Sequence, residues 1–582
     1  MPLSSIRSSS TRPSSPQKNA NKNVATSLPT SSNVPSWKED FAKRNLDEFY
    51  EEAYDFFYRD RQNNNLRSFS SYQYYHDLFR ARSHYWLIFF SMGLANIADS
   101  TELGCMGFLL TSPEFIQDML GGDVSSHGAM FTGSIFAGML VGGILTGAFG
   151  DQKGRRPTLL LGLGLNSISG FCAAISPTIL FLCMCRFAGG LGIGAILSSL
   201  IPLATEISPS SQRGAYVTVI NAFMPIGGLT VGGLAMFMLT KWDLSWRLFV
   251  GACSIPSFLG FLLVYWYVPE SARYLALEGN FTQATNEANY VAKSMGFHGT
   301  WLTPEELKHH FGHELEINDS STKQHVKTLT LMIQEAISGL GNLYSSELRT
   351  STFALKLLWF CLGSGSSFGT WILAIFEQLQ IQHVYFTLFL FWLANVPGLL
   401  AAGILIDKIG RKKVLGGSLA CTAISLCFFS RAAFIGAENS EMYIIITSFI
   451  FHAFLVMSWT ANGILTSESF PTKIRTTGLG VCTASSRIAT ILAQFVNSSL
   501  IQNPSKLILI SSVPIGIGLC ALYFLEDTTN QSLKDDLDQA IELSQFSRSN
   551  SQNNNNGKQD EDVGDRSNSF VLLDGSSSVK LV

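Results

Sequence analysis

The stretch GAFGDQKGRRP at residues 147–157 places an aspartate and a cluster of cations between two long apolar segments. A second stretch, GILIDKIGRKK at residues 403–413, has the same Gly, Asp and Gly at positions i, i+4 and i+7, followed by Arg and a further cation. The copies start at 147 and 403, an offset of 256 residues. A charged phrase repeated with one internal spacing indicates a duplicated unit.

A second pair of phrases supports the duplication. Glu206 and Arg213 are seven residues apart, and so are Glu468 and Arg475. The offset between these copies is 262 residues, close to that of the first phrase. Two homologous halves are therefore expected.

The composition indicates a membrane protein. Of 582 residues, 47% are hydrophobic and 14% are charged, whereas soluble chains carry about 25% charged residues. The net charge of -3 argues against a nucleic-acid partner, which would select a basic surface. The ten cysteines all lie in apolar runs, so we expect small buried hydrophobes rather than metal ligands or disulfides. No nucleotide-binding or metalloenzyme motif is present, so neither a cofactor, a metal nor an enzyme activity is expected.

Twelve apolar segments approach the roughly 20 residues that a spanning helix needs. They fall as six, a polar stretch and six more: 86–110, 126–149, 158–176, 178–204, 214–240 and 246–268, then 353–376, 383–406, 413–435, 441–466, 476–500 and 506–525. The chain thereby divides into five regions: 1–82, a largely disordered cytosolic segment; 83–268, a six-helix bundle; 269–352, a cytosolic linker with amphipathic helices; 353–526, a second six-helix bundle; and 527–582, a disordered cytosolic tail.

Loop charges predict the orientation of the chain. The connections after segments 2, 8 and 10 are rich in Lys and Arg, whereas the first connection, 111–125, has neither. Because cationic loops stay in the cytosol, both termini and the 269–352 linker are expected there.

These phrases resemble those of the major facilitator superfamily, whose signature is a Gly-x-x-x-Asp-x-x-Gly-Arg-[Arg/Lys] loop with a copy in the second half. RFAGGLGIG at 186–194, PESARYL at 269–275 and LEDTTNQSL at 525–533 also resemble its motifs, in the expected order. The resemblance implies an all-α membrane fold of twelve transmembrane helices in two pseudo-symmetric six-helix bundles. It also implies alternating access around a central site.

Within the superfamily, ADSTELG at 98–104 and SSRIATILAQF at 485–495 resemble the synaptic-vesicle-protein-related branch, a neighbour of the organic-ion transporters. Sugar porters carry a Gln-Gln-x-Ser-Gly-like stretch in span 7 and a Gly-Pro-x-Pro-Trp-like stretch in span 10, and this chain has neither. Two further departures are Gln152, where the family usually has Arg or Lys, and Gln494, where a Pro is common in this branch.

The resemblance implies that the repeated loops form a gate, in which the loop aspartate lies near a helix N-terminus and the loop cations touch carboxylates at other span ends. The alternative is that these charges only fix the topology. The predicted gating residues are Gly147, Asp151, Gly154, Arg155, Arg156, Glu206, Arg213, Gly403, Asp407, Gly410, Arg411, Glu468 and Arg475.

Ionisable residues inside predicted spans are expected to mark a pathway, and three of them are candidates for proton coupling. Asp99 and Glu102 are spaced i, i+3 on one helix face, and two neighbouring carboxylates away from water are suited to bind a proton. Arg186 in span 4 is the candidate counter-charge. The alternative is a static ion network that joins spans 1 and 4.

Further candidates bear on the solute. Arg487 in span 11 suits a carboxylate, whereas Glu377 near the end of span 7 would suit a cation or lie solvated at the helix end. Amides and an aromatic could line a central cavity or join helices instead: Asn221, Asn395, Trp459 and Asn462.

The function that these residues favour is transport of a small organic anion or zwitterion, coupled to protons. The alternatives are a sugar or polyol carrier and, from another class, a non-transporting membrane receptor or sensor. We expect a monomer in the plasma membrane or an intracellular vesicle membrane.

Overall fold

The computed structural model describes residues 46–62, 71–122, 124–297, 299–309, 311, 343–345, 348–470 and 475–525. The predictions of disorder for the first 45 residues and for the C-terminal tail from 526 lie outside the described residues. Within the described ranges every regular element is a helix.

The helices fall into two sets around the 269–352 linker. The first half comprises α3 (Ser71–Leu109), α4 (Pro113–Leu120), α5 (Val124–Lys153), α6 (Arg155–Ala174), α7 (Ile179–Glu206), η1 (Ser210–Gln212), α8 (Arg213–Ala235), η2 (Met236–Lys241), α9 (Trp246–Cys253) and α10 (Ile255–Tyr267). The second half comprises α15 (Arg349–Ser366), η3 (Ser367–Trp371), α16 (Ile372–Gln378), α17 (Val384–Leu393), α18 (Asn395–Ile409), α19 (Arg411–Ile435), α20 (Ala437–Ser469), α21 (Arg475–Leu500), α22 (Pro504–Ala521) and η5 (Leu522–Phe524).

Eleven helical segments of the described chain are long and apolar enough to cross a membrane. The remaining long helix, α3, has 39 residues and supplies the first span. Its membrane part buries Asn96, Asp99 and Glu102, and these polar side chains lower the mean hydropathy of the helix. The fold is thus the expected all-α one, and the expected count of twelve spans is consistent with it.

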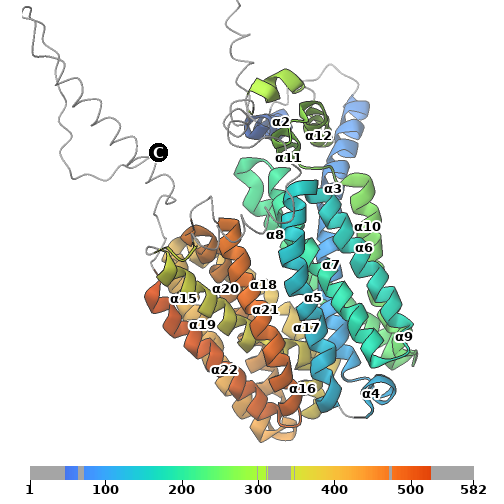
Figure 1. Ribbon diagram of the computed structural model, residues 1–582, viewed down its shortest axis with the longest axis vertical. Coiled ribbons are helices and arrows are strands. Elements are labelled where there is room, and N and C mark those ends of the chain that lie inside the picture. Colours follow the sequence, from blue (N-terminus) through green and yellow to red (C-terminus); the bar gives the residue numbers. More distant parts are fainter. Residues whose placement is uncertain are drawn as a thin grey trace, which may run out of the picture.

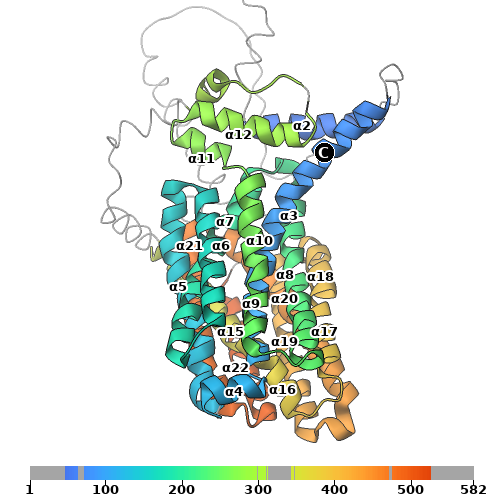
Figure 2. The same ribbon diagram turned by 90° about the vertical axis from the view of Figure 1, so that its right-hand side faces the viewer.

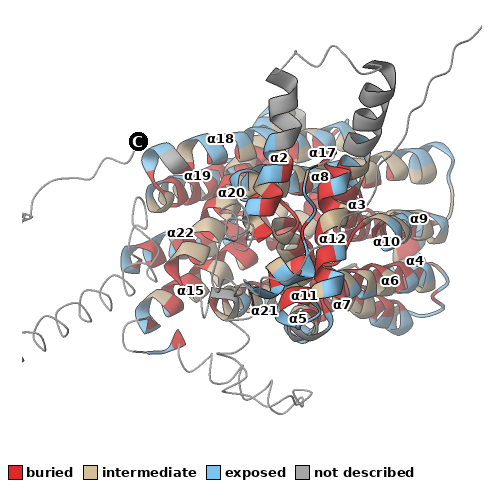
Figure 3. Cartoon of the chain, turned by 90° about the horizontal axis from the view of Figure 1, so that it is seen from above, coloured by how far each residue is buried: buried red, intermediate tan, exposed pale blue. Residues whose placement is uncertain are grey.

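The two halves stand side by side as separate bundles, and Figure 1 colours the first blue to green and the second yellow to red. Figure 3 shows the bundles from above. The two ends of the bundle differ in the segments that they carry. At the motif end, Gly154 and Gly410 join consecutive helices. The far end is the opposite one, where α4 lies (Figure 2).

The halves meet along α5 with α21 and α8 with α17, and α3 also contacts η3 and α16. At the far end, the Ser498 hydroxyl of α21 donates to the carbonyls of Val124 and Ser125 at 3.2 and 3.0 Å. The Thr240 hydroxyl donates to the Tyr385 hydroxyl there at 2.9 Å. Between described residues, the hydrogen bonds that join the halves all lie at this end.

Glycines bring α5 and α7 into close contact. A Cβ on Gly138 would meet the Phe187 carbonyl, and one on Gly190 would meet the Ile135 carbonyl. Small residues allow such approach in membranes, where helix association depends on packing rather than on the hydrophobic effect. The glycines of RFAGGLGIG therefore serve helix packing.

A small helical unit covers the motif end of the first half. It joins α2 (Leu46–Gln62), α11 (Ala272–Leu277) and α12 (Phe281–Ser294), which lie across the ends of the spans (Figure 2). Phe49 of α2 is fully buried and makes an edge contact with Phe297, with ring centroids 5.6 Å apart. The segment before the first span therefore contributes a packed helix.

All ten cysteines are free thiols. Six are buried as expected, but Cys427 and Cys520 are exposed. Both lie in spanning helices, α19 and α22, where the surface that contacts lipid is itself apolar. An apolar run therefore does not distinguish a core cysteine from a lipid-facing one.

Candidate functional site

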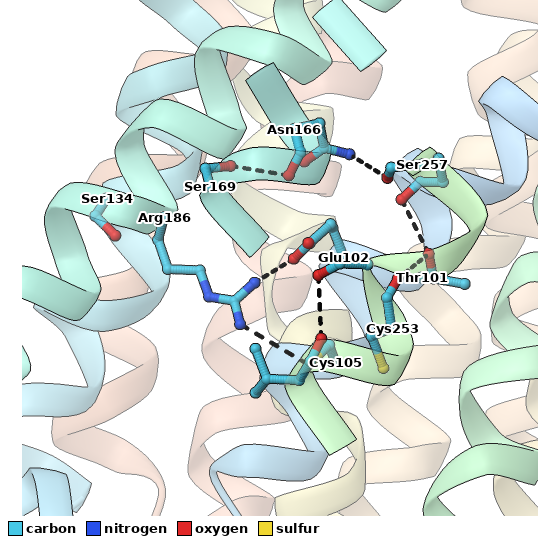
Figure 4. A network of polar contacts seen from close by, with 12 residues as sticks. Thr101, Glu102, Cys105, Ser134, Asn166, Ser169, Arg186, Cys253 and Ser257 are labelled. Atoms are coloured by element: carbon cyan, nitrogen blue, oxygen red, sulfur yellow. Dashed lines mark hydrogen bonds and ion pairs between the residues drawn. The ribbon is translucent and has the colours of Figure 1, made fainter. Parts of the chain in front are cut away.

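A buried ion pair joins spans 1 and 4 within the first half. The Arg186 guanidinium contacts the Glu102 carboxylate, and both side chains are almost fully buried, at 2% and 3% exposure (Figure 4). The Arg186 guanidinium also lies 3.9 Å from the Cys105 sulfur. Pairing and hydrogen bonding compensate the cost of burying two charges, so the pair can persist inside the bundle.

Further polar contacts continue this network toward spans 3 and 6. The Asn166 amide donates to the Ser257 hydroxyl at 2.9 Å, and the Ser169 hydroxyl donates to the Asn166 carbonyl at 2.9 Å (Figure 4). The space beside the ion pair, lined in part by Ser169 and Gly170, has no room for a water molecule. This dry environment is typical of a fixed structural network.

Asp99 has a different partner from Glu102. The spacing of these carboxylates predicts one shared pair facing Arg186, whereas Asp99 forms no salt bridge in the described chain and interacts at longer range with the charge of Arg487 of α21 in the other half. Asp99 is buried, and its Oδ1 atom has no hydrogen-bond partner among the described residues. These intramembrane charges thus divide into one pair within a half and one interaction between halves.

Arg487 is the cation of that second interaction. It lies on α21, is partly buried, and makes no hydrogen bond to any side chain or carbonyl of the described chain. A guanidinium offers five donors and stays charged. A deep arginine with its donors unused is suited to bind an anion.

Aromatic and amide side chains line one face of α20. Trp459 makes an edge contact with Trp359 of α15, with ring centroids 5.5 Å apart. The Trp359 indole donates to the Thr466 hydroxyl at 2.9 Å. Asn462 lies between them on the same helix face, fully buried, and neither polar atom of its side chain has a partner in the described structure. Such unpaired groups are rare in native proteins and need an explanation such as a ligand or a water.

Asn395 contacts a histidine that the sequence analysis did not single out. The Asn395 amide donates to the Trp392 carbonyl at 2.7 Å and lies 3.1 Å from His452 Nε2. His452 is buried against Phe391, with ring centroids 4.0 Å apart. A histidine inside a predicted span was a visible signal, because intramembrane ionisable residues mark functional positions by default.

Two predicted solute-binding residues are exposed. Glu377 lies near the end of α16, where its carboxylate is hydrogen-bonded to the Thr111 hydroxyl of the first half, and its role in solute binding stays a prediction. The helix ends at Gln378, one residue beyond it, which explains this position. Asn221 is exposed on α8, one residue after Ile220, whose carbonyl accepts from the Asn96 amide at 3.0 Å.

The two repeated loops have the same backbone conformation. Gly154 has φ 102° and ψ 162°, and Gly410 has φ 107° and ψ 147°. Only glycine populates this region readily. Each glycine alone joins two long helices, which explains its place in both copies of the phrase.

The arginine that comes after each glycine contacts a glutamate of its own half. Arg155 lies 3.8 Å from Glu206, and Arg411 lies 3.2 Å from Glu468. Arg213, predicted as a further gating residue, pairs with Asp47 of α2 at 2.5 Å. Sequence repeats cannot reveal that partner, because Asp47 lies outside the repeated phrases.

Several predicted gating side chains lie outside the described residues. Gly147 lies in α5, Asp151 near its end, Asp407 in α18 and Arg475 at the start of α21. Gly403, in α18, has open space where a Cβ would be.

Glu270 is a motif-end residue that the sequence analysis did not assign. Its carboxylate accepts from the backbone N–H groups of Arg155, Arg156 and Ser271 at 3.0, 3.2 and 2.9 Å. Burial raises the pKa of Glu270 above its ordinary value, and the three N–H donors oppose that shift. The carboxylate thus caps the N-terminus of α6, where free N–H groups and the helix dipole favour an anion. The signal was the acid in PESARYL.

Substituting Gly154 by Ala is expected to destabilise the motif end strongly. The change forces a Cβ into the Glu270 carboxylate and a non-glycine residue into a region that costs about 1–3 kcal/mol. We expect a fall of several degrees in the melting temperature of the purified protein and loss of function. Gly417→Ala in α19 is the control, because its helical position has nothing within 4 Å of the added Cβ. Equal effects of the two changes would contradict the role of Gly154.

Comparisons with known proteins agree with this architecture. A family model described as "Sugar (and other) transporter" matches residues 91–534. Solute carrier family 22 member 6-A of Xenopus laevis is 29% identical over 396 residues, which cover 68% of this chain and 66%, just under two thirds, of that protein. Organic anion transporter 3 of Mus musculus is 29% identical over 398 residues, covering 67% and 68%. Synaptic vesicle glycoprotein 2C of Rattus norvegicus is 22% identical, covering 77% and 79%.

Solved structures share the fold. The xylose transporter XylE from E. coli, in a partially occluded inward-open conformation, superposes with a TM-score of 0.59 at 17% identity, covering 78% of this chain and 100% of that one. The duplicated bundles and their two signature loops define a multi-pass membrane protein of the major facilitator superfamily. The chain belongs to the sugar (and other) transporter family, whose model spans most of it.

Proposed function

We propose that this protein is a secondary transporter that moves a small organic anion or zwitterion across a membrane together with protons. The observation that carries the proposal is Arg487, a deep guanidinium without a hydrogen-bond partner in the described chain. A charge inside the membrane costs at least about 2.5–3.5 kcal/mol, and the structure gives Arg487 no salt bridge within the described chain. A ligand carboxylate would remove much of that cost.

Asp99 is the proposed proton carrier. Its carboxylate lies in the other half and acts electrostatically on Arg487. When an anionic solute binds the guanidinium, Asp99 loses part of its stabilising charge and is more easily protonated. Binding of the anion thus favours binding of a proton, which is the linkage that a symporter needs.

Glu102 and Arg186 have a supporting role in this proposal. Their buried pair holds the helix that carries Asp99 against span 4. Of the three residues predicted to take part in proton coupling, Asp99 alone is proposed to titrate during transport.

Transport would proceed by alternating access between the two halves. The hydrogen bonds between the halves at the far end, such as those of Ser498, support a conformation closed there and open at the motif end. With the cationic loops in the cytosol, this conformation faces inward. We place both termini in the cytosol and propose a monomer in the plasma membrane or a vesicle membrane.

The names of the relatives favour an organic ion, since two of those compared above belong to the solute carrier 22 and organic anion transporter groups. The runner-up solute is a sugar or polyol, which the aromatic pair Trp359–Trp459 and the unpaired amide of Asn462 would suit. A receptor that does not transport is the alternative from another class.

The test is uptake by proteoliposomes of the purified chain, with a panel of labelled carboxylates, amines and sugars. We expect a carboxylate to accumulate, faster with an inward proton gradient and slower with an uncoupler. Uptake of sugars alone would favour the runner-up. Specific binding without uptake of any solute would favour a receptor, and uptake indifferent to the gradient would exclude proton coupling.

A further inference from the structure

A hydrogen bond between two buried side chains joins span 7 to span 11 near the far end. The Trp371 indole of η3 donates to the Gln494 carbonyl of α21 at 2.7 Å, and both side chains are fully buried. We propose that Gln494 is a positioning residue that fixes Trp371 as a plug of the far-end gate. This inference depends on the proposed function only for the identity of the solute that passes through the gate.

Trp371 lies where span 7 departs from regular α-helix. The span ends its first helix at Ser366, continues as the 3-10 segment η3 and resumes as α16. Short 3-10 stretches inside a helix often mark a functional hinge. Trp371 is the last residue of η3 and is therefore placed by the hinge.

Two further polar side chains of α21, on either side of Gln494, bind span 7 close to Trp371. The Thr490 hydroxyl donates to the Gly363 carbonyl at 3.2 Å, and the Asn497 amide donates to the Ser367 hydroxyl at 3.0 Å. Thr490, Gln494 and Asn497 are spaced i, i+4 and i+7, so they share one helix face. Span 7 is thus attached to α21 at three points, one in the last turn of α15 and two in η3, and Gln494 makes the middle contact on α21.

The Trp371 ring reaches the other half. A Cβ added to Gly128 of α5 would overlap the tip of the indole. One turn earlier on the chain, Val124 and Ser125 accept the hydrogen bonds of Ser498. The indole therefore fills the point where spans 2, 7 and 11 converge, and a displacement of the ring would separate span 7 from span 2.

The Gln494 amide is suited to a gate that must reopen. Its carbonyl satisfies the buried indole N–H, but its own Nε2 atom is buried without a partner in the described structure. The closed state therefore gains one hydrogen bond and leaves one donor unsatisfied, two effects of opposite sign. A fully paired amide would stabilise the closed state without this opposing cost, and reopening would then be less favourable.

Gln494 also connects the gate to the proposed anion site. It comes seven residues after Arg487 on α21, which is two helical turns along the same face. A shift of α21 on anion binding at Arg487 would move the partner of Trp371 with it. Far-end opening and solute occupancy are then linked through one rigid helix.

The experiment measures how often the far end opens, without requiring transport. Thr132 of α5 is fully buried one turn from Gly128, and Thr132→Cys serves as the reporter. A membrane-impermeant thiol reagent is added on the far-end side, and the rate at which it labels the reporter cysteine is measured. The rate in each variant is compared with the rate in the chain that carries the reporter alone. The variants are Gln494→Met, Trp371→Phe and the two combined. Ser499→Ala is the control, because it removes only a bond to Val496 within α21.

We expect each single variant to raise the labelling rate about tenfold, which corresponds to the loss of about one buried hydrogen bond. The combined variant should exceed neither single one by more than about twofold, since both changes remove the same bond, and Ser499→Ala should be unchanged. Unchanged labelling in Gln494→Met, or rates that multiply in the combined variant, would overturn the proposal. Labelling as expected in a chain that takes up no solute would refute the proposed function and leave the gate standing.

Discussion

Uptake of an anionic solute is expected to fall at least about 100-fold when Arg487 is replaced by Met. Truncating one partner of a desolvated charge pair typically costs about 2–5 kcal/mol or more, and 100-fold corresponds to about 2.7 kcal/mol. The loss should appear mainly in the KM for the solute, because the guanidinium is proposed to hold the anion directly. The measurement is initial-rate uptake in proteoliposomes at matched protein content.

Two further variants make this prediction specific. Arg487→Lys keeps a positive charge but loses the planar fork that binds a carboxylate through two parallel bonds, so an intermediate loss of about tenfold is expected. Asp99→Asn keeps the shape of the side chain and removes its titration. It should leave anion binding within a few-fold and abolish the response to a proton gradient.

Trp459→Phe tests whether the loss of anion uptake is specific to removal of the Arg487 charge, because it changes a candidate solute contact on α20 without altering any ionisable group. If Arg487→Met lowered the uptake of neutral and anionic solutes alike, the arginine would have a structural role. An unchanged KM for the anion would contradict the proposed site directly.

The fold was accessible from the sequence because duplication and apolar length are local patterns. The repeated phrase predicts two halves, and the glycines at its i+7 positions, Gly154 and Gly410, have the same left-handed conformation. The first span is recognisable from its apolar residues although Asp99 and Glu102 lower its hydropathy. These signals depend on neighbours along the chain and not on tertiary contacts.

The partners of the charged residues were not accessible in the same way. A spacing of i, i+3 places Asp99 and Glu102 on one face, but three positions on a helix still differ by about 60° around its axis. That difference suffices for Glu102 to face Arg186 and for Asp99 to act on Arg487. Likewise, Arg213 binds Asp47, which lies 166 residues earlier in the chain, and no repeat predicts this contact.

A departure from the family pattern can be explained only when the tertiary contacts of the residue are known. Gln494 departs from the pattern that the resemblance implies, and its neighbours along the sequence offer no reason for an amide. In the structure, its carbonyl accepts the Trp371 indole at 2.7 Å. A residue that breaks a family pattern inside a membrane is therefore best examined for a buried polar partner on another span.

Arg186→Met is expected to cause the largest loss of stability of any substitution considered. It leaves the Glu102 carboxylate buried without its counter-charge, at 3% exposure, and breaking a buried pair in this way costs about 3–5 kcal/mol. We expect a large fall in melting temperature in detergent, with little folded protein recovered. Glu102→Gln should cost less than Arg186→Met, because a neutral amide can still accept a hydrogen bond from the guanidinium.

The combined variant Glu102→Met/Arg186→Met separates a structural role of the pair from a role in proton coupling. Replacing both partners of a buried pair by hydrophobic residues of similar volume is often nearly neutral, so most of the lost melting temperature should return. If the pair is static, as its dry surroundings indicate, this chain should still accumulate solute in response to a proton gradient, whereas Asp99→Asn should not. A stable double variant that transports but ignores the gradient would instead assign the titrating proton to Glu102, and the roles proposed for the two carboxylates would be exchanged.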